Sequence, residues 1–173
     1  MTFEELTVGL KELIAQKVSF RRIAGNSIFI YFFGGPGDAS VVSIEFDPPW
    51  RYERDGKVIV ASYDFWLQES DFESKDNYQE TFHRRCALCD PLIGSNLLSF
   101  NLDIASSDLA LQLSNGQTLR NFANSAFDEL AWVYRTNPLD LGRHCFTKWD
   151  KRVRYESAET DMATRLDFFG LRE

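Results

Sequence analysis

Long hydrophobic runs are absent from this 173-residue chain: no stretch of 18 or more apolar residues occurs, which excludes a membrane-spanning helix. The first residues, Met-Thr-Phe-Glu-Glu-Leu, carry acid where a secretory signal carries base, and they lack an apolar segment. Only three cysteines are present, an odd number that fits a reducing compartment better than a disulfide framework. The sequence therefore predicts a cytoplasmic protein without a membrane partner.

Basic residues are also scarce relative to acids. The 19 Lys and Arg residues against 26 Asp and Glu give a formal net charge of −7. A nucleic-acid binder generally needs a basic surface that displaces counterions, so we expect no nucleic-acid partner. Apolar residues are abundant instead, at 44% with 15 Phe, and a chain of this size can bury a sizeable aromatic-rich core.

A loose internal repeat links residues 18–32 with residues 98–113. Each copy joins two strand-like runs through a small polar turn, and each follows a stretch with helical spacing. Two related halves, each too small to bury its own apolar face, would pack together into one domain. The repeat thus predicts scaffold rather than chemistry.

Periodicity assigns most of the chain to helices and strands. Helical spacing occurs over 2–16, where Thr2 and Glu5 form a capping box, and over 77–93. Asp55-Gly56 is a two-residue hairpin turn, and Ser114-Asn-Gly116 makes a second hairpin turn. Strand-like runs fill the intervals 18–23, 27–33, 39–46, 50–54, 57–63, 97–104, 109–113, 117–122 and 127–134. Beyond these, Cys145–Trp149 is predicted as an edge strand and Ala158–Phe169 as a helix.

The predicted fold is an α+β domain over residues 1–142. It consists of two pseudo-repeats of helix plus antiparallel strands, over 1–63 and 77–142, whose sheets pack against each other with the helices at the flanks. An acidic linker over 64–76 joins the two halves. Residues 143–173 form a C-terminal extension that packs on the domain.

The linker has the composition of a protein-binding segment. Over residues 64–76 it holds five acids against one lysine and three large aromatic residues. Exposed aromatic residues flanked by charge are typical of interface hot spots, and the carboxylates would steer a basic partner toward them. The alternative is that the aromatic rings pack inward and the acids only solvate a loop. The predicted partner-binding residues are Asp64, Phe65, Trp66, Glu69, Asp71, Phe72, Glu73 and Asp76.

A second candidate is the spacing His83-x-x-Cys86-x-x-Cys89, with His144-Cys145 much later. Zinc takes thiolate and imidazole ligands, and a cysteine beside a histidine can act as a nucleophile. Cys86 and Cys89, however, share a helical stripe with apolar residues, where a core cysteine is expected. We therefore predict no metal, no cofactor and no catalytic residue, and keep a metal-dependent or thiol enzyme as the alternative.

Two weaker patterns favour structural roles. Glu45 and Asp47 share a strand face and could act as an acid–base pair, but Asp47 precedes two prolines, where an aspartate usually caps a turn. The loop Gly34-Gly-Pro-Gly37 lacks the Lys-Ser/Thr and the helix of a phosphate-binding loop.

A series of short motifs runs along the chain: Asp47-Pro-Pro-Trp-Arg51, Asp55-Gly56, Val58–Asp64, Ser107-Asp-Leu-Ala-Leu111, Asn115-Gly116, Leu119 and Glu129-x-x-Trp132. This pattern resembles that of a group of small bacterial α+β proteins, some of them similar to immunity proteins. Immunity proteins neutralise toxins that bacteria use in competition. Ala61 stands where the pattern usually has Gly. The resemblance implies a non-enzymatic protein that binds a cognate toxin directly, and it implies no catalytic residue. A third hypothesis is an oligomeric structural or regulatory protein that pairs through an exposed sheet edge.

Overall fold

The computed structural model describes residues 3–36, 41–103, 106, 108–122, 130–136, 142–147 and 152–157. The helices are α1 (Phe3–Glu12) and α2 (Lys75–Ala87), with short 3₁₀ helices η1 (Ser62–Phe65), η2 (Glu69–Asp71) and η3 (Asp90–Leu92). The first strands are β1 (Val18–Ala24), β2 (Ser27–Phe32), β3 (Val42–Phe46), β4 (Trp50–Arg54) and β5 (Lys57–Ala61). The later strands are β6 (Leu97–Asp103), β7 (Asp108–Leu113), β8 (Gln117–Asn121), β9 (Leu130–Thr136), β10 (Gly142–Thr147) and β11 (Arg152–Ser157).

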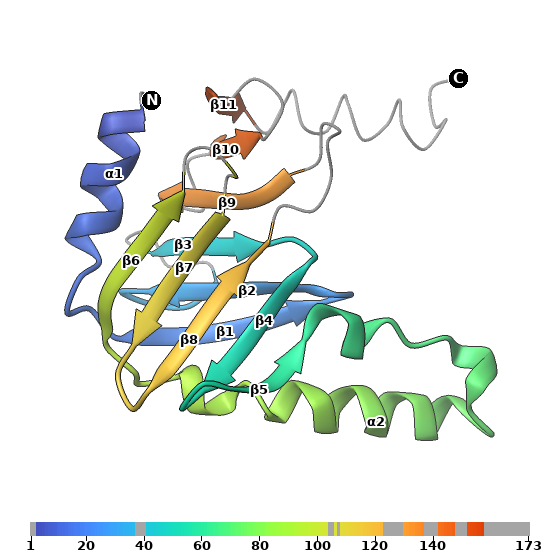
Figure 1. Cartoon of the computed structure of the whole chain (residues 1–173). Helices are drawn as coiled ribbons and strands as arrows, with labels where there is room; N and C mark the ends of the chain where they lie inside the picture. Colours follow the sequence, from blue (N-terminus) through green and yellow to red (C-terminus); the bar gives the residue numbers. More distant parts are fainter. Residues whose placement is uncertain are drawn as a thin grey trace, which may run out of the picture.

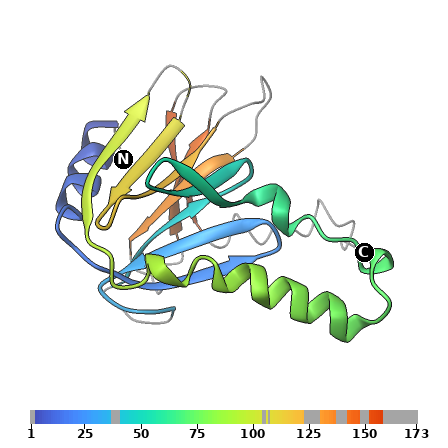
Figure 2. The same ribbon diagram turned by 60° about the horizontal axis from the view of Figure 1, so that its bottom comes forward.

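The strands form two antiparallel sheets, so the predicted α+β class is confirmed. One sheet has six strands in the order β1-β2-β3-β9-β10-β11, and the other has five in the order β5-β4-β8-β7-β6. Figure 1 shows the five-stranded sheet crossing in front of strands β1, β2 and β3. In both views α1 and α2 lie at different sides of the sheets, as predicted (Figures 1 and 2).

The two halves exchange hairpins between the sheets. Strands β4 and β5 belong to the other sheet, where β4 pairs with β8 and Trp50 lies opposite Asn121, while β5 pairs with β4. In return β9 pairs with β3, and Phe46 lies opposite Trp132. The chain crosses between the sheets at Asp47-Pro48-Pro49, where proline offers no N–H to continue a ladder. The expectation that each half keeps its own sheet is therefore wrong.

The buried apolar residues of the described part of the chain form one core between the sheets, and both sheets contribute to it. Alternation along the strands turns every second side chain inward, and the bulky inward residues are fully covered. Leu10 of α1 and Leu92 of η3 close its sides. The buried core residues from the sheets include Ile28, Ile30, Phe32, Ile44, Phe46, Trp50, Tyr52, Val60, Leu97, Leu109, Leu111, Leu113 and Leu119.

The segments that lead into β1 and β6 pair with each other, around an antiparallel bridge between Lys17 and Asn96. Four backbone hydrogen bonds surround this bridge in two matching pairs. Ala15 N–H donates to Leu97 O (2.7 Å) and Gly94 N–H to Val18 O (2.8 Å), while Leu97 N–H donates to Gln16 O and Val18 N–H to Ser95 O (2.9 Å each). Ala15 and Gly94 both have positive φ, at 68° and 84°.

The boundaries of several predicted elements need correction. The helix predicted over 2–16 ends at Glu12, and the one predicted over 77–93 is split into α2 and η3 because Pro91 cannot continue α2. β10 is an interior strand between β9 and β11, whereas an edge strand was predicted over Cys145–Trp149. Residues 37–40, Trp149 and the helix predicted over 158–169 lie outside the described residues.

None of the helices in the described part of the chain has the length and apolar character needed to cross a membrane.

Candidate protein-binding surface

Tyr63 and Trp66 form a stacked aromatic pair on the surface just after β5. Their ring centroids lie 6.1 Å apart and their planes differ by 6°. Tyr63 is 63% exposed and Trp66 is 62% exposed, more than any other large hydrophobic residue of the described part of the chain. Two adjacent exposed rings bury much apolar area when a partner covers them, at little cost in side-chain entropy.

The backbone of η1 holds this pair in place. The Asp64 carboxylate accepts a hydrogen bond from Ala61 N–H (2.8 Å), and Trp66 N–H donates to Tyr63 O (3.1 Å). A guanidinium nitrogen of Arg85, on α2, donates to the backbone carbonyl of Asp64. The turn is therefore fixed to both β5 and α2, and the two rings are preorganised.

Phe65 lies between these residues in sequence but points the other way. It is 5% exposed, with its ring centroid 5.7 Å from that of Trp50 and 5.8 Å from that of Phe82. The prediction that Phe65 contacts a partner is therefore wrong, because its ring anchors η1 to the core. Phe72 is half-buried, edge-on to Tyr78 at 5.6 Å, and offers only part of its surface.

The predicted acidic residues are all exposed. Glu69 and Asp71 lie on η2, Glu73 follows it, and Asp64 and Asp76 lie at either end of the segment. Asp76 falls in the first turn of α2, behind the N-cap Ser74, whose hydroxyl accepts a hydrogen bond from Asn77 N–H (3.2 Å). A carboxylate there also stabilises the helix through its dipole, so Asp76 has a structural function as well.

Sequence reasoning missed the apolar part of this surface. Tyr63 was assigned to a strand, and Val58 and Ile59 of β5 are 54% and 37% exposed. A valine-rich strand suggests burial, whereas Val58 and Ile59 lie at a bulge of an edge strand and both face solvent. We name Tyr63, Asp64, Trp66, Glu69, Asp71, Glu73 and Asp76 the aromatic–acidic surface.

The cysteine pair lies against the core. Cys89 is fully buried, and burial raises the pKa of its thiol to about 12. Burial also raises the pKa of Cys86, which is half-buried, although the nearby Arg21 opposes this shift. Arg21 itself is ion-paired with Asp90 of η3. Protonated thiols are poor nucleophiles, so this geometry does not support the thiol-enzyme alternative.

Metal binding by the same segment finds no support either. His83 is exposed, whereas Cys89 points into the core. Within the described ranges, no three His, Cys, Asp or Glu side chains come together as ligands for a metal ion. The side chains of His144 and Cys145 lie outside the described set.

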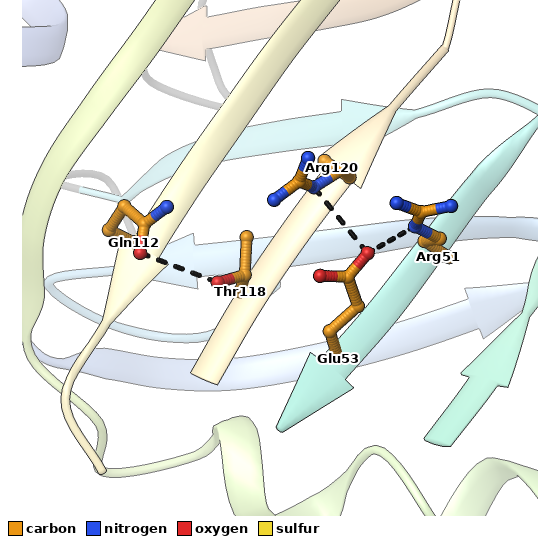
Figure 3. A network of polar contacts seen from close by, with 5 residues as sticks. All are labelled: Arg51, Glu53, Gln112, Thr118 and Arg120. Atoms are coloured by element: carbon orange, nitrogen blue, oxygen red, sulfur yellow. Dashed lines mark hydrogen bonds and ion pairs between the residues drawn. The ribbon is translucent and has the colours of Figure 1, made fainter. Parts of the chain in front are cut away.

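A polar cluster lies on the face of the five-stranded sheet that points away from the core (Figure 3). Glu53 lies between two guanidinium groups: Arg51 Nε donates to its Oε1, and Arg120 Nε lies 3.6 Å from the same atom. Arg51 and Arg120 are opposite each other in the β4–β8 register, so Glu53 compensates a like-charge contact. The Arg51 guanidinium also lies 4.4 Å from the centroid of the Phe122 ring. This cluster stabilises the sheet and offers no paired carboxylates.

The Asp47 side chain contacts β2 at the point where the chain crosses between the sheets, and its turn-capping role stays a prediction. Its carboxylate accepts a hydrogen bond from the Ser27 hydroxyl (2.6 Å), which ties the crossing segment to β2. This bond fixes the point at which the chain changes sheet.

Comparison with protein-family models, with curated proteins and with solved structures finds no significant match for this chain. The resemblance to immunity proteins therefore depends on the short sequence motifs alone and stays a prediction. The function has to be argued from the surface itself.

Proposed function

We propose that this chain is a non-enzymatic binding protein of the bacterial cytoplasm, an immunity protein that neutralises a cognate toxin by direct contact. The contact is the aromatic–acidic surface. The observation that carries the proposal is the stacked pair of Tyr63 and Trp66, both more than 60% exposed and fixed by η1. Exposed aromatic residues held in one conformation are the usual anchors of protein interfaces.

The charges around the pair favour a basic partner. Asp64 lies between the two aromatic residues in sequence, and the exposed carboxylates of Glu69, Asp71 and Glu73 follow them along the chain. The whole chain carries a net charge of −7. Toxin domains that attack nucleic acid are generally basic, so attraction would accelerate encounter and salt would slow it. The toxin would be blocked by steric and electrostatic contact, without chemistry.

We also infer that the two halves are pseudo-repeats related by a local two-fold axis near Lys17 and Asn96. The two matching pairs of backbone hydrogen bonds around this bridge support the inference. So do the similar burial patterns of β1 and β6, each with a register irregularity after its first residue. The aromatic–acidic surface falls between the halves, where the repeat is interrupted. The boundary of a C-terminal extension at residue 143 stays a prediction.

The test replaces Trp66, Asp71 and Glu73 by alanine together and measures binding to the product of the adjacent gene by calorimetry. We expect at least a 100-fold loss of affinity, because one hot-spot aromatic residue alone contributes about 2 kcal/mol or more. Protection of cells that express the same product should be lost in parallel.

The control replaces an exposed hydrophobic residue and an exposed acidic residue elsewhere on the surface. Leu98 is 57% exposed on β6 and Glu12 is exposed on α1, so Leu98→Ala and Glu12→Gln should leave binding unchanged. If the triple variant bound as tightly as the control variants, the aromatic–acidic surface would not be the contact. If the upstream gene belonged to a metabolic operon and did not encode a toxin, the immunity assignment would be wrong.

A further inference from the structure

Strand β5 is an edge of the five-stranded sheet. Among the described strands, the order β5-β4-β8-β7-β6 gives β5 a neighbour on one side only, and its Val58 and Ile59 are 54% and 37% exposed. At the opposite edge, the residue before β6 bridges to the residue before β1, so that edge is partly closed. An open edge with apolar side chains is a template for another strand.

The two ends of this edge carry opposite charges. Lys57 is exposed at the start of β5, and Asp64 lies just beyond its end. The hydrogen bond from Ala61 N–H to Asp64 Oδ2 keeps the carboxylate beside the last residue of the strand. An edge with a cation at one end and an anion at the other is complementary to an antiparallel copy of itself.

We propose that β5 pairs with β5 of a second copy of this chain, antiparallel and across a two-fold axis. Lys57 of each copy then lies near Asp64 of the other, and Val58 and Ile59 of both copies become covered. The two five-stranded sheets join into one continuous sheet. A second copy fits better than a uniformly basic strand, which Lys57 would repel at one end.

The pairing is short and the dimer is correspondingly weak. The register shift between Tyr52 and Glu53 leaves Ile59 as an extra residue in β5, and this bulge limits how far a regular ladder can extend. We expect a dissociation constant on the order of 100 µM, at the weak end for specific interfaces. The dimer requires no toxin, so it is tested independently of the proposed function.

The experiment measures self-association of the full chain by sedimentation equilibrium up to millimolar concentration. Lys57→Glu places acid near Asp64 of the second copy, and Asp64→Lys places two lysines together, so each variant alone should be monomeric. A mixture of the two variants restores both attractive pairs, and it should form a dimer as readily as the wild type. A mixture that stays monomeric, or a wild type that is monomeric throughout, overturns the proposal.

A second set of variants avoids any loss of folding at Asp64. Val58→Lys changes an exposed residue of β5 and should raise the dissociation constant at least tenfold, whereas Leu98→Lys, on the exposed part of β6, should leave it unchanged. Asp64→Asn keeps an acceptor for Ala61 N–H and should weaken the dimer by charge alone. If Leu98→Lys abolished association and Val58→Lys did not, pairing through β5 would be wrong. Trp66→Ala should leave the dimer intact, which separates the pairing through β5 from the exposed aromatic pair of Tyr63 and Trp66.

Discussion

Phe65 and Trp66 show how two neighbouring aromatic residues take opposite roles. The 3₁₀ turn of η1 directs Phe65 onto Trp50 and Phe82, whereas Trp66 stacks on Tyr63 in solvent. Composition places both residues in one aromatic cluster, and only the direction of the turn separates them. One therefore contributes to stability and the other is available for binding.

This difference can be measured by urea unfolding of two variants. Phe65→Ala should lower the free energy of unfolding by about 3–5 kcal/mol, because it leaves a cavity between β4 and α2. Trp66→Ala removes an exposed ring and should change the free energy of unfolding by only about 0.5 kcal/mol. Equal losses for the two variants would show that the Tyr63–Trp66 stack belongs to the core.

Cys89 makes the protein less stable at alkaline pH. Its pKa is about 12 in the folded chain, against an ordinary value of 9.0, so only the unfolded chain releases the proton between these values. Below about pH 9 the Cys89 thiol is protonated in both states and does not change the free energy of unfolding. As pH rises from 9 toward 12, the free energy of unfolding falls, by at most about 1.4 kcal/mol per pH unit.

The variant Cys89→Ala isolates this effect. At pH 8 it should be less stable than the wild type because of the small cavity, and the difference should shrink as pH rises to 11. Lysines and tyrosines titrate in both proteins and cancel in the comparison. A difference that stays constant over this pH range would mean that Cys89 does not carry the dependence.

At the scale of elements, local signals predicted the hairpins well. Asp55-Gly56 is a two-residue turn between the paired residues Arg54 and Lys57, and Ser114-Asn-Gly116 is a three-residue turn between Leu113 and Gln117. Asp55, Gly56, Asn115 and Gly116 all have positive φ, between 50° and 74°. Such turns need residues that tolerate this conformation, which makes the Asp-Gly and Asn-Gly pairs informative. The two turns also meet in space, because Asp55 N–H donates to Gly116 O (2.9 Å). Nothing in the sequence of either turn predicts this contact.

The exchange of hairpins between the sheets could not be predicted. β4 pairs with β8, whose residues lie about 70 positions further along the chain, and nothing in either strand specifies this choice. The prolines after Asp47 indicate a break but not its direction. For the same reason the edge position of β5 was missed, and with it the exposure of Val58 and Ile59. The exposure of the acidic residues was predicted because charged side chains generally remain in solvent.

At the scale of the whole molecule, the exchanged hairpins leave neither half able to fold separately. Removing residues 1–63 would take β4 and β5 from the five-stranded sheet and β1, β2 and β3 from the other. The buried core is one cluster that includes residues of both sheets. The described part of the chain is therefore expected to unfold as one cooperative unit.

Two core substitutions, one in each sheet, test this cooperativity. Ile30→Ala in β2 and Leu111→Ala in β7 remove side chains that are 0% exposed, so each should cost about 2–5 kcal/mol. Because the halves share one core, both variants should shift a single transition, with tryptophan fluorescence and far-ultraviolet circular dichroism coinciding. The exposed Leu98→Ala serves as the control and should leave the midpoint almost unchanged. Two separate transitions, with Ile30→Ala moving only one of them, would show that the sheets unfold independently despite the exchanged hairpins.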